Sequence, residues 1–205
     1  LHIARWGVSI TTPQVSKTKA TVKVVTSVKN SRLSGSDVRL RVKLSGPDGR
    51  ELKSTETPVS FAANSRAEIP LSLEVGSPAL WSPESPQLCR ADVLVLEEDK
   101  IVDQVTTTFG IREIRFSAEK GFTLNGEPVE LRGACLHHDN GPLGAAAINR
   151  AEERKVELMK AQGYNAIRAS HNPPSAVFLD ACDRLGMLVM NEAFDCWEKG
   201  KNPDD

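Results

Sequence analysis

Residues 1–112 alternate apolar and polar side chains with a period of two. The clearest segment is VRLRVKLSG at 38–46, where valines and leucines alternate with arginines and a lysine. Such alternation with one charged face is typical of a strand that covers a core on one side only. Residues 20–28 and 68–75 repeat the pattern, and GPDG at 46–49 has turn chemistry. This half therefore predicts an antiparallel, immunoglobulin-like β-sandwich of about seven strands.

Residues 113–205 follow a different pattern, in which short apolar segments alternate with helical ones. Asn125-Gly126 predicts a hairpin turn near the start. Helices are predicted at 148–163 and 173–186. The apolar segments are predicted strands, namely 129–136, 165–170 and 187–194. Short apolar strands joined by helices pair in parallel. Three are too few for a closed barrel, so this half predicts either a small open α/β sheet or the first β-α-β-α-β part of a (β/α)8 TIM barrel.

The ends of both helices carry their own signals. Asn149 is a candidate N-cap with Glu152 three residues on, and Gly163 suits the position after the helix end. The second helix is predicted to open at its prolines and to close at Gly186.

Composition and charge exclude several classes of function. The chain has 205 residues, 40% hydrophobic and 26% charged, with a formal net charge of -1. It therefore offers no basic surface for nucleic acid or an anionic membrane. No apolar run approaches the roughly 20 residues that a membrane helix needs. The first residues do not have the pattern of a signal peptide, so we expect the chain to begin within a longer protein, and its localisation (cytoplasmic, periplasmic or secreted) stays open.

The four cysteines predict neither a zinc ribbon nor a disulfide framework. None of them forms a CxxC pair, and four in a chain of this length are sparse. We expect free thiols that are mostly buried, because free cysteine usually packs as a small hydrophobe.

Polar side chains follow each of the three predicted parallel strands. Because the carboxyl ends of such strands form the functional face of βα architectures, we expect these side chains to converge. Taken singly, each has an ordinary explanation, as a loop histidine, an ion-paired arginine or a packed tryptophan. Their coincidence at three strand ends favours a site. The residues are His137, His138, Asp139, Arg168, His171, Asp195 and Trp197.

Two kinds of site fit these residue types. A metal site is disfavoured because the adjacent His137 and His138 project to opposite sides, which makes joint ligation awkward. A sugar site fits better, because sugars present hydroxyls to Asp, His and Arg and apolar ring faces to Trp. Glu192 lies inside the third predicted strand, where a carboxylate needs a partner whatever its role.

Four motifs resemble glycoside hydrolase family 2, most of all its β-galactosidases, with β-glucuronidases and β-mannosidases as relatives. The motifs are LWSPESPQL (80–88), RGACLHHDNGPLG (132–144), NAIRASHNPP (165–174) and LVMNEAFDCW (188–197). Cys89 departs from the family, which often has an aromatic residue there. The resemblance implies an immunoglobulin-like domain at 1–112 and the N-terminal portion of the catalytic barrel at 113–205. The family's first domain and its last five barrel strands would lie outside the chain.

The resemblance also implies roles for individual residues. Arg168 would hydrogen-bond the catalytic nucleophile and keep it ionised, because a nearby cation lowers the pKa of an acid. The substrate-binding residues of the glycone pocket, which holds the sugar that is released, would be His137, Asp139, Arg168, His171, Asp195 and Trp197.

The two catalytic carboxyl groups are not expected in this chain. Retaining hydrolysis places them about 5 to 5.5 Å apart, and in family 2 both are glutamates on the fourth and seventh barrel strands. Asn191-Glu192 imitates the end of the acid/base motif but belongs to the third predicted strand, so Glu192 is not expected to be the acid/base. The chain alone is expected to be inactive.

The expected partners are β-galactoside oligosaccharides or glycans, with neither nucleic acid nor a membrane. No cofactor or metal is expected in this segment, although some relatives use Mg²⁺ or Na⁺. An unclosed barrel leaves an exposed sheet edge, which favours a homo-oligomer. Three alternatives stay open: a β-glucuronidase or β-mannosidase of the same family, a non-catalytic carbohydrate-binding or structural module, and a metal-dependent hydrolase. A glucuronidase would need extra cationic or amide groups around the sugar carboxylate, and none is obvious here.

Overall fold

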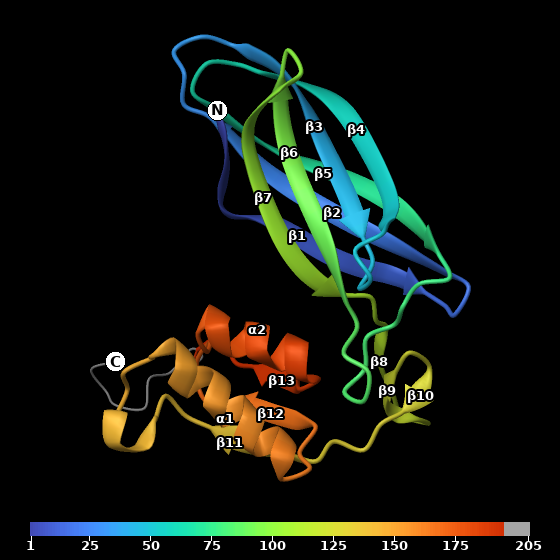
Figure 1. Ribbon diagram of the computed structural model, residues 1–205, viewed down its shortest axis with the longest axis vertical. Coiled ribbons are helices and arrows are strands. Elements are labelled where there is room, and N and C mark those ends of the chain that lie inside the picture. Colours follow the sequence, from blue (N-terminus) through green and yellow to red (C-terminus); the bar gives the residue numbers. More distant parts are fainter. Residues whose placement is uncertain (195–205) are drawn as a thin grey trace. The chain divides into compact units, whose positions relative to one another are not determined.

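The computed structural model describes residues 1–194 and divides into two compact units (Figure 1). The first unit comprises Leu1–Trp81 and Gln87–Pro128. The second comprises Ser82–Pro86 and the residues from Val129 onward. The short β8–β9–β10 sheet described below therefore groups with the sandwich, and the domain boundary predicted at 112/113 stays a prediction.

The first unit is the predicted immunoglobulin-like sandwich. One sheet has the strand order β1-β2-β5 and the other has the order β4-β3-β6-β7, and all neighbouring strands are antiparallel. The strands are β1 (His2–Val15), β2 (Lys19–Asn30), β3 (Ser36–Ser45), β4 (Glu51–Phe61), β5 (Ser65–Gly76), β6 (Leu88–Glu97) and β7 (Lys100–Gly110).

Strand β3 shows how the alternating sequence builds this unit. Val38, Leu40, Val42 and Leu44 are buried in the sandwich core, while the intervening basic residues project from the opposite face of the sheet. Glu56 accepts hydrogen bonds there from Arg39 at 2.8 Å and Arg41 at 2.6 Å. The predicted division into an apolar and a charged face is confirmed.

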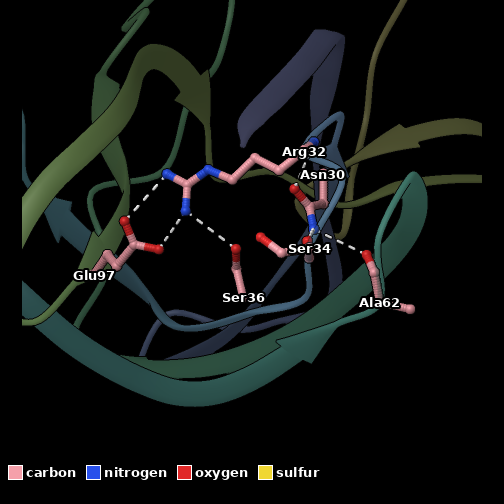
Figure 2. Close-up of polar contacts among 6 residues, drawn as sticks. All are labelled: Asn30, Arg32, Ser34, Ser36, Ala62 and Glu97. Atoms are coloured by element: carbon pink, nitrogen blue, oxygen red, sulfur yellow. Dashed lines mark hydrogen bonds and ion pairs between the residues drawn. The ribbon is translucent and has the colours of Figure 1, made fainter.

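A polar cluster fixes the loop between β2 and β3 (Figure 2). The buried Asn30 donates from Nδ2 to the carbonyl oxygens of Ser34 and Ala62, and its Oδ1 accepts from the Arg32 backbone. The Arg32 guanidinium binds both carboxylate oxygens of Glu97, at 2.5 and 3.1 Å. A single buried amide thereby satisfies backbone groups of this loop and of the connection between β4 and β5.

The predicted hairpin turn lies in a small antiparallel sheet of β8 (Ile114–Ser117), β9 (Gly121–Leu124) and β10 (Glu127–Pro128). Asn125 and Gly126 both have positive φ, 53° and 86°, as a two-residue hairpin turn requires. The Asn125 side chain accepts from the Glu113 backbone and donates to the carbonyl oxygen of the buried Trp81. The turn therefore also ties the end of β7 to the segment before β6.

The second unit holds three parallel strands in the order β11-β12-β13, as predicted. Helices α1 and α2 connect them and pack on each other through a cluster around Val156, Ile167 and Phe178. The elements are β11 (Gly133–Leu136), the 3-10 turn η1 (Gly141–Leu143), α1 (Asn149–Ala161), β12 (Ala166–Ala169), α2 (Ala176–Leu185) and β13 (Leu188–Asn191). This βαβαβ order fits both architectures predicted from the sequence, a small open α/β sheet and the start of a (β/α)8 barrel.

Three predicted boundaries are corrected. The first parallel strand begins at Gly133, because the Asn165 side chain binds the backbone of Glu130 and Arg132 instead. The third ends at Asn191, so Glu192 follows the strand. Helix α2 begins after its prolines, where the Ser175 hydroxyl accepts from the Phe178 backbone and supplies the cap.

The N-cap predicted for α1 is also wrong. Ile148 occupies that position without a side-chain cap, and Asn149 is the first helical residue. Glu152 is buried and its carboxylate binds other partners. The glycines after both helices, Gly163 and Gly186, have the predicted positive φ, 84° and 75°.

Residues 82–86 lie against the start of β13 and helix α1 within the second unit. Lys160 on α1 donates from Nζ to the carbonyl oxygen of Pro83 at 2.7 Å and to that of Gly186 at 2.8 Å. A β-carbon on Gly186 would lie 2.3 Å from the Pro83 oxygen, so only glycine fits there.

No helix within residues 1–194 is long and apolar enough to cross a membrane. Among the same residues, Cys89, Cys135 and Cys182 are free thiols, and Cys135 is exposed while the other two are buried. Cys196 lies outside the described residues.

Candidate functional site

The parallel pairing of β11, β12 and β13 places their carboxyl ends at one edge of the sheet. In register, Cys135 pairs with Arg168 and Arg168 pairs with Met190, and all three side chains are exposed. Their neighbours Ile167 and Ala169 are buried, with Ile167 in the cluster beneath the helices. The sheet thus has one covered face and one open face, and Arg168 projects from the open face.

Arg168 binds groups from both neighbouring strands. Its Nε donates to Glu192 Oε1 at 2.5 Å, and its Nη1 donates to Cys135 Sγ at 3.7 Å. The hydrogen bond with Glu192, followed by that with Cys135, raises the pKa of Arg168 above its usual value. Nη2 makes no hydrogen bond within residues 1–194, so this nitrogen is placed to donate to a further acceptor.

His137 and His171 come together from the ends of two strands. Their ring centroids lie 5.4 Å apart, with the rings edge to face at 63°. His137 directly follows β11, and His171 follows the buried Ser170 after β12. The peptide bond between Ser170 and His171 is cis. Two of the predicted site histidines therefore form one contact at the carboxyl edge of the sheet.

Asp139 lies in the exposed loop after His137. Its Oδ1 accepts from the backbone of Gly141 at 2.7 Å, and its own backbone donates to the His137 carbonyl. The next residue, Asn140, donates from Nδ2 to the carbonyl oxygen of Ala146. These bonds hold the loop that carries His137 and Asp139 in a compact turn.

Glu152 lies beneath this edge, on the first turn of α1, and is only 3% exposed. Its carboxylate receives hydrogen bonds from Asn140, Lys155 and Ser175. Burial alone raises the pKa of Glu152, but the hydrogen bonds from Lys155, Asn140 and Ser175 outweigh burial and hold the pKa below its usual value. The carboxylate is therefore ionised at neutral pH. A small cavity above it is lined by His137, His138 and Asn172, among others.

The structure describes four of the six predicted substrate-binding residues, and their role in binding stays a prediction. Asp195 and Trp197 lie outside the described residues. Cys135, Glu192 and Glu152 make contacts that the sequence reasoning did not assign. The need of Glu192 for a partner was predicted and is met by Arg168. Cys135 could have been identified from the sequence by its position two residues before His137. Glu152 could have been identified as a carboxylate at an otherwise apolar position of its helix.

The described residues offer no metal centre. No three His, Cys, Asp or Glu side chains among residues 1–194 lie close enough to hold an ion. The described residues therefore form no ligand set that fits Mg²⁺.

An immunoglobulin-like sandwich followed by parallel βα strands, with polar side chains at their carboxyl ends, defines a multidomain protein with an α/β site domain. Two family models match the chain: glycosyl hydrolases family 2 at residues 1–112, and the TIM barrel domain of that family at residues 116–196. The chain belongs to glycosyl hydrolase family 2, and its three parallel strands are the start of the TIM barrel domain.

Curated relatives carry two different activity names. The chain is 38% identical over 205 residues to β-galactosidase BoGH2A of Bacteroides ovatus, covering all of this chain and 24% of that protein. It is also 38% identical over 204 residues to a protein of Formosa agariphila named as a β-glucuronidase, of which it covers 19%. The chain thus spans about a quarter or less of the length of these relatives.

Solved structures of the family superpose closely. A family 2 member from Bacteroides cellulosilyticus has a TM-score of 0.92 at 45% identity, covering 96% of this chain and 27% of that one. A β-glucuronidase from Bacteroides uniformis, covalently bound to cyclophellitol-6-carboxylate aziridine, has a TM-score of 0.90 at 32% identity over 98% and 25% of the two chains. The shared fold therefore includes both units.

Proposed function

We propose that this chain is a segment of a retaining glycoside hydrolase that removes terminal β-D-galactose residues. In this proposal, the open face and carboxyl edge of the three-stranded sheet form part of the glycone pocket. The observation that carries it is the position of Arg168 on that face, with His137 and His171 in contact at the adjacent edge. Family membership supports the reaction class.

The proposed mechanism uses Arg168 as an electrostatic partner of the nucleophile. A retaining enzyme needs one carboxylate that stays ionised and a second carboxyl group that carries a proton. Arg168 already binds Glu192 through Nε and Cys135 through Nη1, and its guanidinium has further N–H donors. A nucleophilic carboxylate from another barrel strand would accept a hydrogen bond from one of these donors and would be kept ionised by the guanidinium charge.

The histidines and Asp139 would bind the sugar itself. Imidazole and carboxylate side chains, such as those of His137, His171 and Asp139, are groups that exchange hydrogen bonds with sugar hydroxyls. Such bonds orient the anomeric carbon toward the nucleophile, and those that strengthen in the transition state accelerate the reaction. Asp195 and Trp197 remain proposed members of the same pocket.

Glu192 is proposed to support Arg168 and not to act as the acid/base. Its carboxylate follows β13 and is held by the guanidinium from the neighbouring strand. Turnover of aryl glycosides by the 205-residue chain alone, abolished by Glu192→Gln, would contradict this proposal. We expect no turnover by the chain alone.

Galactoside specificity is tested with a panel of p-nitrophenyl β-glycosides on the full-length enzyme. The β-galactoside is expected to give the highest kcat/KM. The alternative, a β-glucuronidase, is supported by the relatives that carry that name, and a higher kcat/KM for the β-glucuronide would replace our proposal with it.

The role of Arg168 is tested in the same enzyme. Arg168→Lys keeps the charge but loses the fork of donors, so we expect kcat/KM to fall by about 10²- to 10³-fold. Arg184→Lys is the matched control, because that arginine lies on α2 with its side chain 53% exposed, and it should leave kcat/KM unchanged. Equal activity of the two variants would remove Arg168 from the mechanism.

A further inference from the structure

Glu152 occupies a position on α1 where an apolar side chain would be expected. It lies four residues before the buried Val156, on the helix face that packs toward the cluster of the second unit. A buried carboxylate costs free energy unless hydrogen bonds compensate it. Helix packing alone does not explain this residue, since a methionine or leucine would pack there without that cost.

The hydrogen-bond partners of Glu152 lie in two different loops. Oε1 accepts from Asn140 Nδ2 at 3.1 Å, and Oε2 accepts from Ser175 Oγ at 2.9 Å. Asn140 belongs to the loop after β11, and Ser175 belongs to the loop after β12. These are the loops that carry His137 with Asp139 and His171, respectively. One buried carboxylate thus joins both loops of the candidate site.

The side chain that makes each of these two hydrogen bonds is also held by a second interaction. The Asn140 amide nitrogen lies between two acceptors, Glu152 and the Ala146 carbonyl oxygen, so only one orientation of the amide satisfies both. The Ser175 hydroxyl donates to Glu152 while it accepts from the Phe178 backbone as the cap of α2. Lys155 on the next turn pairs with Oε1 at 2.8 Å and balances the charge.

We propose that Glu152 is a positioning residue of the active site, which holds the loops after β11 and β12 at the separation that brings His137 and His171 into contact. This inference rests on the proposed function, because it assumes that these loops line the sugar pocket. Glu152 touches no substrate. It acts by removing the freedom of two loops before substrate binds, which lowers the cost of orienting the sugar.

The test uses Glu152→Met in the full-length enzyme, with hydrogen–deuterium exchange and steady-state kinetics as readouts. Methionine matches the length of glutamate and packs in apolar surroundings, but it leaves both loops untied. We expect faster amide exchange in peptides covering 137–148 and 170–175, with α1 and β12 unchanged. We expect kcat/KM for the preferred aryl glycoside to fall by about 10- to 100-fold.

Two further variants make the experiment specific. Glu152→Gln keeps one acceptor oxygen and an amide that can donate to Ser175, so it should recover part of the activity and of the exchange protection. Glu153→Gln removes the same charge from the neighbouring residue, which pairs only with Arg150 and Arg184 among the described residues. It should match the wild type in both readouts.

The outcomes separate this inference from the proposed function. Unchanged exchange in both loops and unchanged kcat/KM for Glu152→Met would overturn the positioning role. A wild-type enzyme without activity on any aryl glycoside, together with faster loop exchange in Glu152→Met, would overturn the proposed function but leave the loop tie standing. If Glu152→Met does not fold, Asn140→Ala cuts one tie from the loop side, and faster exchange limited to 137–148 is then expected. If exchange in 137–148 is not faster in Asn140→Ala, the inference is overturned.

Discussion

At the scale of single residues, burial separates the cysteine side chains into two chemical classes. Burial raises the pKa of Cys89 to about 11, and burial with the charge of Asp183 raises the pKa of Cys182 to about 12. At about pH 8, roughly one in a thousand Cys89 thiols is therefore ionised, and neither thiol is accessible. In a Cys196→Ser background, we expect Cys135 to react rapidly with a thiol reagent such as DTNB, while Cys89 and Cys182 react only on unfolding.

The control for this prediction is Cys135→Ser in the same background. It should abolish the fast phase and leave the slow phase intact, as followed by absorbance with and without denaturant. A fast phase that persists in Cys135→Ser would show that Cys89 or Cys182 is accessible in the folded chain.

At the scale of elements, the glycines that end α1 and α2 have the same conformation but different surroundings. Gly163 has open space where a β-carbon would lie, whereas at Gly186 the β-carbon would meet the Pro83 carbonyl oxygen. Gly163→Ala should therefore lower the free energy of unfolding by about 1 kcal/mol, which is the strain of placing alanine at a positive φ. Gly186→Ala adds a clash between the new β-carbon and the Pro83 carbonyl oxygen. We expect it to lower the free energy of unfolding by at least about 2 kcal/mol more.

Urea unfolding of the two variants measures this difference, with each serving as the matched control of the other. A larger loss for Gly186→Ala would show that residues 82–86 are a packed part of the second unit. Equal losses of unfolding free energy would mean that the segment around Pro83 can move away without destabilising the protein.

At the scale of the whole molecule, the second unit leaves apolar surface uncovered. Parallel sheets are normally covered on both faces, yet Met190 on the open face is 60% exposed. Strands β11 and β13 each pair on one side only among the described residues. An unpaired strand edge is a template for another chain.

We therefore expect residues 1–205, expressed alone, to self-associate, and residues 1–128 to stay monomeric. Light scattering after size-exclusion chromatography measures both masses. Met190→Lys should weaken the association, because a charge on the exposed surface opposes sheet pairing. A 205-residue chain that is monomeric at the highest concentration it reaches would contradict the prediction.

Local patterns predicted the elements well wherever one face of the element is buried. The alternation in β3, the Asn125-Gly126 turn and the glycines after α1 and α2 each reflect an interaction within a few residues, so they can be read from the chain. The wrong predictions concern the ends of elements that are set by contacts with residues distant in the sequence. Asn165 binds the segment before β11 across about thirty positions of sequence, and Glu152 binds Asn140 and Ser175 instead of capping its own helix.

The convergence of the strand ends could be predicted, because parallel strands bring their carboxyl ends to one edge of the sheet. The contact between His137 and His171 fits that expectation. The pairing of Arg168 with Glu192 required the register of β12 against β13, and no sequence pattern specifies it. The roles of His137, Asp139, Arg168 and His171 in sugar binding stay predictions until activity is measured.

The sequence by itself determined the order of strands and helices, the family and the strand ends at which polar residues gather, because periodicity and short motifs are local properties. Only the tertiary structure decided which polar groups meet. The loops after β11 and β12 are joined through a carboxylate on α1, and Arg168 is held by the residue after β13, because hydrogen bonds select partners by distance in space and not along the chain.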